Sequence, residues 1–229
     1  MMKMNKSIIL LSGGLDSVVS LATLKNSHNI QLALTFNYGQ KSFEKESNAA
    51  KLIANYYSIE HKVIALDWLK DITHTSLVSE DELPDLEIEN LDNSKLAEES
   101  AKSVWVPNRN GVFINIAACF ADSYSYTHII IGANREEAST FKDNSPKFID
   151  SINLSLKNST NNPVKVIAPL IDKTKNEIVK LGIENNIPFN IIRSCYRNTK
   201  KHCGACESCN RLKRAIISNN RDDLLKLIF

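Results

Sequence analysis

Short apolar runs alternate with amphipathic stretches over most of the chain. Runs rich in β-branched residues predict buried strands at 7–11, 30–36, 61–66, 127–134 and 164–170. Between them, apolar positions recur with a helical period at 16–25, 41–58, 110–125, 146–158 and 173–186. Strands that alternate with helices are typical of a parallel sheet with helices on both faces. The pattern therefore predicts an α/β fold.

One long stretch, 71–103, breaks this alternation. It contains ten Asp or Glu residues against two Lys and shows no apolar periodicity, although a short helix is predicted around 94–102. A solvated surface insertion is the simpler interpretation, and a lid that closes over a site is the alternative. The strand and helix pattern then resumes and continues to about residue 190. We therefore predict a main domain over 1–190 and a small subdomain over 191–229.

The composition is that of an ordinary globular protein. Of 229 residues, 43% are hydrophobic and 24% are charged, which is enough apolar material for a buried core. A formal net charge of +2 gives no strong field toward nucleic acids or membranes. The apolar runs are too short to span a bilayer, and residues 1–6 lead into a strand rather than a signal sequence. We therefore expect a cytoplasmic protein with no membrane partner and no direct nucleic-acid partner.

Two glycines stand together directly after the first predicted strand, in the sequence Ser-Gly-Gly-Leu-Asp-Ser. In an open α/β sheet, ligands bind at this end of the strands. Gly13 and Gly14 permit a sharp turn with outward-facing N–H groups, which suits an anion such as phosphate. Ser12 and Ser17 add hydroxyl donors. Asp16 would repel phosphate, so it is either the N-cap of the next helix or a ligand of Mg²⁺ on the phosphates. A tight turn capped by Asp16 is the simpler interpretation.

Four of the five cysteines lie close together near the C-terminus, at Cys195, Cys203, Cys206 and Cys209. In a reducing compartment, such a cluster indicates a metal site rather than disulfides. Four thiolates suit tetrahedral Zn²⁺ in a closed structural site, and a redox pair or an iron–sulfur cluster is the alternative. His202 could replace one thiolate, but its neighbour Cys203 fits the spacing better.

The residues around these cysteines favour metal-bound thiolate. A helix is predicted to start near Cys206 with its positive end toward the sulfurs. Four basic residues are expected to surround the cluster: Arg197, Lys200, Lys201 and Arg211. Positive charge lowers thiol pKa values and so favours the metal-bound form. The fifth cysteine, Cys119, lies in an apolar helical pattern and is expected to be an inert core residue.

The two motifs together resemble one family. The glycine loop resembles the PP-loop (SGGxDS) of the ATP pyrophosphatase superfamily, whose members cleave ATP to AMP and pyrophosphate. With SCY…CGxCxxC near the C-terminus, the chain resembles the 7-cyano-7-deazaguanine synthase family. The likeness extends to FNYGQKSFEKE (36–46), VPNRNG (106–111) and PLIDKTKNEIVKLG (169–182). One block, residues 132–150, departs from the family. The family usually has a glycine–tyrosine–proline–aspartate–cysteine stretch at this place, whereas this chain reads GANREEASTFKDNSPKFID.

The resemblance implies a Rossmann-like PP-loop domain of the adenine nucleotide alpha hydrolase-like class, with a small C-terminal zinc-binding helical subdomain. It implies that ATP adenylates the carboxylate of 7-carboxy-7-deazaguanine and that ammonia displaces AMP to give an amide. A second ATP then converts the amide to the nitrile, which serves queuosine-type tRNA modification. ATP, Mg²⁺ and Zn²⁺ are the implied cofactors, and we expect a homodimer. No glutaminase-like nucleophile is apparent, so the ammonia is expected to be free or delivered by a partner.

The candidate site residues follow from these motifs. We expect catalysis to depend on five residues, namely Ser12, Asp16, Ser17, Arg109 and Lys175. Lys175 and Arg109 would neutralise charge that grows on the phosphates. We expect ATP to contact two strand ends and the loop, at Leu10, Leu11, Ser12, Gly13, Gly14, Leu15, Asp16, Ser17, Val18, Tyr38 and Gln40. We expect the base to contact a further set of polar residues, at Arg109, Asn110, Glu136, Glu137 and Asp143.

Several candidates have a simpler structural interpretation. Arg109 could pair with the acidic insertion or simply begin a helix. Residues 38–40 could be a strand-ending turn, and Glu136 and Glu137 could be an exposed helix start that the helix dipole stabilises. Lys175 lies in the first turn of a predicted helix, where a cation opposes the dipole. That unfavourable placement favours a functional role for Lys175.

Two other functions stay open on the sequence. A different PP-loop ligase would keep the adenylation but use another acceptor, such as a protein, a tRNA base or a small molecule, and the departing segment 132–150 motivates it. A zinc-ribbon nucleic-acid module is the third possibility, because residues 193–214 hold seven Lys or Arg and one Glu. Tyr196 is the only aromatic residue in this basic stretch, which disfavours that interpretation.

Overall fold

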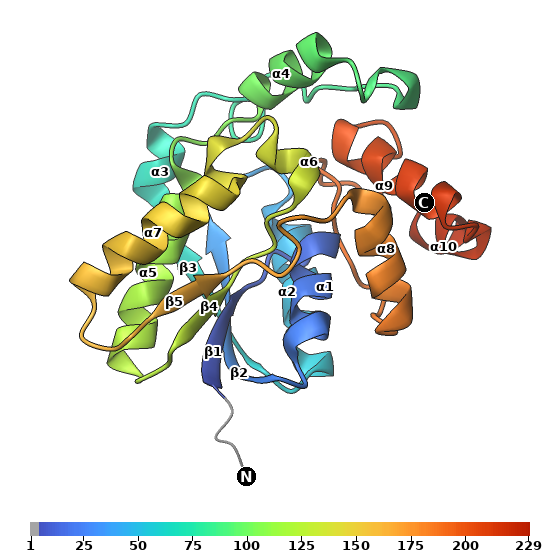
Figure 1. Ribbon diagram of the computed structural model, residues 1–229. Coiled ribbons are helices and arrows are strands. Elements are labelled where there is room, and N and C mark those ends of the chain that lie inside the picture. Colours follow the sequence, from blue (N-terminus) through green and yellow to red (C-terminus); the bar gives the residue numbers. More distant parts are fainter. Residues whose placement is uncertain (1–4) are drawn as a thin grey trace.

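Strand β1 (Asn5–Leu10) is the centre of a five-stranded parallel sheet. The computed structural model describes residues 5–229, and its sheet also contains β2 (His28–Asn37), β3 (Glu60–Ala65), β4 (His128–Ile130) and β5 (Lys165–Ile167). The strand order is β3-β2-β1-β4-β5, and every neighbouring pair is parallel (Figure 1). The predicted α/β fold and its five strands are confirmed. The prediction on residues 1–6 falls partly on residues 1–4, which lie outside the described residues.

Alternate residues of β1 face two separate apolar cores. Ile8 and Leu10 belong to the core on one face of the sheet, and Ile9 belongs to the core on the other. All three side chains are buried. Burial of both faces explains why this strand has a continuous apolar run instead of an alternating pattern. Each such side chain contributes roughly 1.5–3 kcal/mol through its burial.

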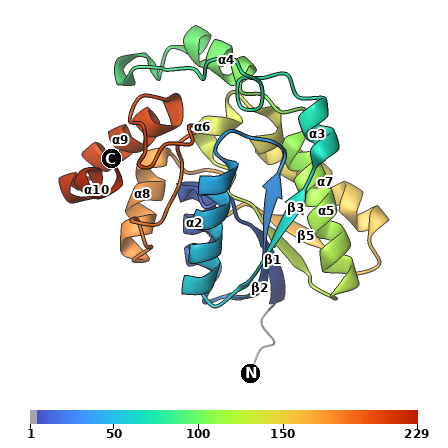
Figure 2. The same cartoon turned by 180° about the vertical axis from the view of Figure 1, so that it is seen from behind.

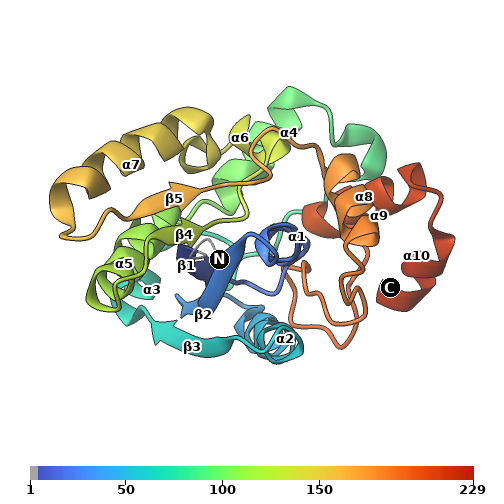
Figure 3. The ribbon, with the colours of Figure 1, turned by 60° about the horizontal axis from the view of Figure 1, so that its bottom comes forward.

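Helices cover both faces of the sheet (Figures 2 and 3). One face carries α1 (Leu15–Leu24) and α2 (Phe43–Tyr56), and further out α8 (Lys175–Glu184), α9 (Glu207–Ser218) and α10 (Asp222–Ile228). The other face carries α3 (Asp67–Asp71), α5 (Arg109–Ser123) and α7 (Pro146–Ser159). The sequence pattern missed α3 and α10 because helices of five and seven residues cover fewer than two turns. None of the helices in residues 5–229 has the length and apolar character that crossing a membrane requires.

The insertion 71–103 differs from the solvated loop that the sequence suggests. Its two ends meet where the Ser76 Oγ and N–H donate to the Ser103 carbonyl (2.8 and 2.9 Å). Six apolar side chains between them are buried: Leu77, Leu83, Leu86, Leu91, Ala97 and Ala101. Over most of the segment, their spacing has the period of neither a strand nor a helix. Their burial could therefore not be predicted from the sequence pattern. The predicted short helix is α4 (Ser94–Ser103).

The insertion crosses the molecule above the carboxyl ends of the strands and reaches the C-terminal subdomain (Figures 1 and 2). The Asp85 carboxylate accepts two hydrogen bonds from Arg197, both at 2.8 Å. The Leu86 carbonyl accepts from the Asn210 side chain (2.9 Å), and Arg214 pairs with Asp92 (2.9 Å). The acidic composition therefore serves in part to dock the insertion on basic residues of the subdomain.

Cys119 is exposed, so the expectation of an inert core residue is wrong. Helix α5 buries Ile114, Ala117, Ala118 and Ala121 against the sheet. Residue 119 lies on the opposite side of this helix. The apolar pattern of α5 is broad enough that the buried side was misjudged by one position.

Candidate active site

The glycine loop connects the end of β1 to α1 at the point where the strand order reverses between β1 and β4. Gly13 has φ +80°, a conformation that favours glycine. A Cβ at Gly13 would lie 2.9 Å from three atoms of α2: the Glu46 carbonyl oxygen, the Ala49 Cβ and the Ala50 nitrogen. The Gly13 carbonyl accepts a hydrogen bond from the Arg193 backbone N–H (2.7 Å). Gly13 therefore serves the shape of the loop and its packing on α2.

Gly13→Ala is expected to lower the free energy of unfolding by about 2–4 kcal/mol, since it adds backbone strain and a steric clash. Gly14→Ala is the matched control, because Gly14 has φ −76° and its Cβ would meet nothing closer than Ser12 Oγ at 3.3 Å. Urea unfolding of both variants measures the difference. Equal midpoints for the two variants would contradict this role of Gly13.

A cavity of about 260 Å³ opens at the carboxyl ends of the strands, beside the glycine loop. Its aromatic lining comes from Phe36, Tyr38, Trp105, Phe113, Phe141 and Tyr196. Its charged lining includes Asp16, Glu46, Arg109, Glu137, Lys175 and Arg193. Apolar and aromatic walls with a few placed charged groups are typical of small-molecule sites.

Hydroxyl groups hold the backbone of the glycine loop. The Gly14 N–H donates to Ser12 Oγ (3.2 Å), and Ser17 Oγ donates to the Gly14 carbonyl (3.0 Å). The hydroxyls of Ser12 and Ser17 lie 3.2 Å apart. The Leu15 N–H donates to Ser194 Oγ (3.2 Å), which ties the loop to the C-terminal subdomain. Of the residues that the sequence predicts to contact ATP in this region, most line the cavity: Leu10, Leu11, Ser12, Gly14, Leu15, Asp16 and Ser17. Gly13 and Val18 do not line it.

Asp16 is paired with Lys175 at the base of this cavity. The Lys175 Nζ lies 2.7 Å from Asp16 Oδ2 and 3.6 Å from Glu137 Oε1. Lys175 is only 8% exposed, although it is the first residue of α8. Burial alone would lower the pKa of Lys175, but the carboxylates of Asp16 and Glu137 raise it above its usual value, so the amine stays charged.

The expectation that Asp16 caps α1 is wrong, because the N-cap is Gly14 and Asp16 lies in the first turn. Asp16 Oδ1 is buried and has no hydrogen-bond partner among the described residues. An orphaned carboxylate oxygen beside a phosphate-type loop fits a ligand of Mg²⁺, which prefers oxygen donors. The second of the two roles predicted from the sequence therefore fits the geometry better.

Arg109 begins α5 and directs its guanidinium toward Tyr38, whose hydroxyl accepts a hydrogen bond from it (3.5 Å). Burial alone would lower the pKa of Arg109, but its neighbours Tyr38 and Asp143 raise it above its usual value, so the guanidinium remains a cation. Within residues 5–229, no ion pair joins Arg109 to the insertion. One of its simpler interpretations, pairing with the acidic loop, is therefore wrong.

Two further candidates, Asn110 and Asp143, contact each other. The Asn110 N–H donates to Asp143 Oδ2 (3.1 Å), and the Asn110 side-chain amide donates to the Asp143 carbonyl (3.0 Å). Both residues are buried and line the cavity. A carboxylate at the first turn of α5 also complements the helix dipole. Their contacts fix the start of α5, and with it the position of Arg109.

Residues 38–40 do form a turn, but the turn faces the cavity. Gln40 accepts from the Tyr38 N–H (3.0 Å) and donates to the Phe36 carbonyl (3.0 Å) and to Glu46 Oε2 (3.1 Å). Burial raises the pKa of Glu46, and hydrogen bonds from Ser42 and Gln40 oppose the rise. The strand-ending turn and the cavity lining are thus the same structure.

Glu136 and Glu137 lie on α6 (Arg135–Ala138), the short helix that follows β4, and neither side chain is fully exposed. Glu136 Oε1 accepts from the Lys175 backbone N–H (2.7 Å), and Glu136 Oε2 pairs with Arg211 (3.2 Å). The expected exposed helix start is therefore wrong. Both oxygens of Glu136 have partners, whereas within the described part of the chain the Glu137 carboxylate has one ion-pair contact, at 3.6 Å from the Lys175 Nζ. Of the two carboxylates, Glu137 is therefore the more open to a ligand.

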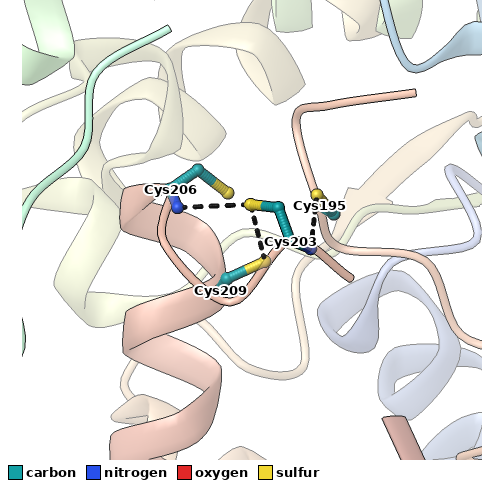
Figure 4. A group of neighbouring side chains, drawn as sticks. All are labelled: Cys195, Cys203, Cys206 and Cys209. Atoms are coloured by element: carbon teal, nitrogen blue, oxygen red, sulfur yellow. Dashed lines mark hydrogen bonds between the residues drawn. The ribbon is translucent and has the colours of Figure 1, made fainter. Parts of the chain in front are cut away.

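The four clustered cysteines converge on one point (Figure 4). The sulfurs of Cys195, Cys203, Cys206 and Cys209 all lie within 4.8 Å of one another. This donor set fits a thiophilic metal in a closed tetrahedral site, as the spacing predicts. His202 is not part of the cluster, because its Nε2 accepts from the Ser194 N–H (3.0 Å).

The expected ring of basic residues is only partly present. Arg197 donates to Cys203 Sγ (3.6 Å), and Lys200 and Lys201 are exposed. Arg211 was expected near the thiolates but lies on the other side of α9, where it lines the cavity and pairs with Glu207 and Glu136. Helical geometry explains the error, since residues two apart on a helix face different directions.

The subdomain around the cysteines forms one wall of the cavity, which sequence reasoning missed. Ser194 and Tyr196 flank the ligand Cys195, and Glu207 and Ser208 lie between Cys206 and Cys209. Burial and the Glu207 carboxylate raise the pKa of Tyr196 well above its usual value. Because successive residues of an extended chain face opposite ways, Ser194 and Tyr196 can face the cavity although Cys195 between them does not. That alternation was the available signal. Glu207 and Ser208 reach the cavity from the first turn of α9.

Comparison with known proteins gives concordant results. Residues 6–220 match the family model described as queuosine biosynthesis protein QueC. The 7-cyano-7-deazaguanine synthase of Pelotomaculum thermopropionicum is 52% identical over 211 residues, which cover 92% of this chain and 96% of that one. The synthase of the same name from Carboxydothermus hydrogenoformans is 50% identical over 212 residues, covering 93% and 98%.

A solved 4-thiouridine synthetase, in complex with RNA and with ATP bound, has the same fold. Its TM-score is 0.53 at 20% identity, with 97% of this chain and 52% of that chain covered. At this low identity the likeness shows the fold alone. It agrees with the PP-loop fold predicted from the glycine loop.

Proposed function

The chain belongs to the QueC family of queuosine biosynthesis proteins, and from this premise we propose that it is an ATP-dependent ligase that makes 7-cyano-7-deazaguanine. Its substrates are 7-carboxy-7-deazaguanine, ammonia and ATP. The observation that carries the proposal is the buried Lys175–Asp16 pair, 2.7 Å apart, at a PP-loop that opens into an aromatic cavity. A cation and an anion-binding loop at one end suit phosphates, and flat aromatic walls suit a purine-like base.

The reaction then needs no nucleophilic side chain. A carboxylate oxygen of the base attacks the α-phosphorus of ATP, and pyrophosphate leaves. Ammonia attacks the activated carbonyl carbon, and AMP leaves with one of the original carboxylate oxygens. The amide oxygen attacks a second ATP in the same way, and loss of the amide protons and of AMP leaves the nitrile.

The side chains of this chain have separable roles in these steps. The N–H groups of the loop and the hydroxyls of Ser12 and Ser17 hold the phosphates. The charged amine of Lys175 stabilises the pentacovalent phosphorus and the leaving pyrophosphate. Arg109 supplies a second cation beside Tyr38. Mg²⁺ on Asp16 would neutralise further phosphate charge.

The metal of the cysteine cluster is proposed to be Zn²⁺ in a structural role. Cys195, Cys203, Cys206 and Cys209 would hold it, and no position would be left for a substrate. Its effect on the reaction is indirect, because the chain around it carries Ser194 and Tyr196 to the cavity. The proposal also includes a homodimer in the cytoplasm that makes no direct contact with nucleic acid.

Recognition of the base is assigned to the aromatic part of the cavity and to Glu137. The rings of Trp105 and Phe141 are nearly parallel (7°), with centroids 6.1 Å apart. Both rings line the cavity. A carboxylate such as Glu137 accepts from a guanine-like N–H and amino group together, which selects this base edge.

A related PP-loop ligase with another acceptor is the second candidate, and segment 132–150 favours it. This segment lacks the string that the family usually has, yet it supplies Glu137, Phe141 and Asp143 to the cavity. The two candidates share the adenylation and differ only in the molecule that is adenylated.

Incubation of the pure protein with ATP, Mg²⁺, ammonium and 7-carboxy-7-deazaguanine separates the candidates. Mass spectrometry of the bases and nucleotides is expected to show the nitrile together with AMP. AMP with only the amide would mean that the second activation is lost. No AMP with this base, while ATP still binds, would overturn the first candidate in favour of the second.

A further inference from the structure

An ion-pair network connects the cysteine-bearing subdomain to the glycine loop. It begins at Arg211 on α9, two residues after the metal ligand Cys209. The Arg211 guanidinium lies 2.8 Å from Glu207 Oε1 and 3.2 Å from Glu136 Oε2. The Arg211 side chain is 16% exposed and that of Glu136 is 19% exposed, so solvent screens this contact weakly.

The network continues from Glu136 to the active-site lysine. The other carboxylate oxygen of Glu136 accepts a hydrogen bond from the Lys175 backbone N–H (2.7 Å). The Lys175 Nζ lies 2.7 Å from Asp16 of the glycine loop. Arg211 is therefore connected to the loop through two intermediate residues, Glu136 and Lys175.

The orientation of the Glu136 carboxylate decides whether the Lys175 ammonium pairs with Glu136 or with Asp16. The carboxylate of Glu136 adds to the negative charge that surrounds both Lys175 and Asp16. Without Arg211, one oxygen of Glu136 would lose its main cation, and the Lys175 ammonium would be a nearby replacement. Arg214 compensates only in part, since it lies 3.6 Å from Glu136 and is shared with Asp92 at 2.9 Å.

We propose that Arg211 is a positioning residue that holds Glu136 on the backbone of Lys175 and so keeps the Lys175 ammonium free for Asp16 and for the phosphates of ATP. This inference rests on the proposed use of ATP at this site. It also gives the cysteine-bearing subdomain a specific task, because the position of Arg211 on α9 depends on the fold around Cys206 and Cys209.

The test measures ATP affinity in the presence of Mg²⁺ by isothermal titration calorimetry. Arg211→Gln is expected to weaken ATP binding roughly tenfold, which is a usual size for coupling between such groups. Glu136→Gln alone is expected to change affinity by less than about threefold, since the amide oxygen can still accept from the Lys175 N–H. The double variant Arg211→Gln/Glu136→Gln is expected to recover most of the loss, because it removes the competing carboxylate.

The recovery is the decisive result. A purely structural role of Arg211 in packing α9 predicts that the double variant binds ATP no better than Arg211→Gln, and that result would overturn the proposal. Arg221→Ala is the matched control, because among residues 5–229 Arg221 forms its one ion pair with the exposed Asp223 and neither residue lines the cavity. This variant is expected to bind ATP normally.

Two additional measurements keep the test independent of folding and of the acceptor. Metal content and thermal unfolding are recorded for every variant. If Arg211→Gln does not fold, Arg211→Lys is used in its place, because a lysine can reach Glu136 or Glu207 but not both. We expect this variant to lose part of its ATP affinity and to regain it when Glu136→Gln is added. Because ATP affinity does not depend on the base, a protein that binds ATP but ignores 7-carboxy-7-deazaguanine would refute the proposed function and leave this inference testable.

Discussion

Replacing Lys175 with alanine is expected to lower the rate of AMP formation by about two to three orders of magnitude. The ammonium of Lys175 is buried at the glycine loop, 2.7 Å from Asp16. In the proposed reaction, this is where charge would grow on the phosphates in the transition state. Its removal also leaves the Asp16 carboxylate without its cation, which would repel ATP. We expect kcat to fall more than KM rises, because the charge on phosphorus is greatest in the transition state.

Lys173→Ala is the matched control for this prediction. Lys173 is two residues away and precedes the same helix, but it is 42% exposed and lies 4.0 Å from Glu177. Its replacement is expected to change the rate less than about threefold. Steady-state measurement of AMP release compares the two variants. A similar rate loss in both would mean that the effect is structural, and an active Lys175→Ala variant would remove Lys175 from the mechanism.

Replacing Cys209 with serine is expected to abolish metal binding and to destabilise the protein by at least several kcal/mol. Structural Zn²⁺ sites contribute on the order of 10 kcal/mol when their ligands are assembled by folding. Cys209 is buried and its sulfur lies within 4.8 Å of the other three. Loss of the cluster also frees the chain that carries Ser194, Tyr196 and Arg211 to the cavity. We therefore expect activity to be lost together with the metal.

Cys119→Ser provides the control, since Cys119 is exposed on α5 and distant from the cluster in sequence and in contacts. Elemental analysis gives the metal and its stoichiometry, and urea unfolding gives the stability. A colourless protein with zinc supports the structural site, whereas visible absorption and bound iron would favour the iron–sulfur alternative. Full metal content and activity in Cys209→Ser would contradict the four-cysteine site.

The strands and the two motifs could be predicted because their signals are local. β1 is a buried strand with an apolar run, and the glycine loop directly after it needs a residue with positive φ at Gly13. The cysteine spacing is likewise a local pattern, and the four sulfurs do meet. Each of these features depends on residues that are neighbours in the sequence.

Features that depend on tertiary contact were missed or misjudged. Glu46 and Trp105 line the cavity only because α2 and the segment that follows the insertion are folded over the strand ends. The role of Glu136 depends on Arg211, 75 residues later in the chain. The buried side of α5 was misjudged at Cys119 because apolar residues surround most of that helix. No periodicity within one segment reports such distant partners.

An oxygen-18 label offers the most direct test of the proposed chemistry. The protein is given 7-carboxy-7-deazaguanine labelled in both carboxylate oxygens, with ATP, Mg²⁺ and ammonium, and the AMP is analysed by mass spectrometry. We predict that each AMP carries one labelled oxygen, because each is released with an oxygen that began on the base, and that the nitrile carries none. Unlabelled AMP would mean that ATP is cleaved without activating the base, and it would contradict adenylation of this carboxylate.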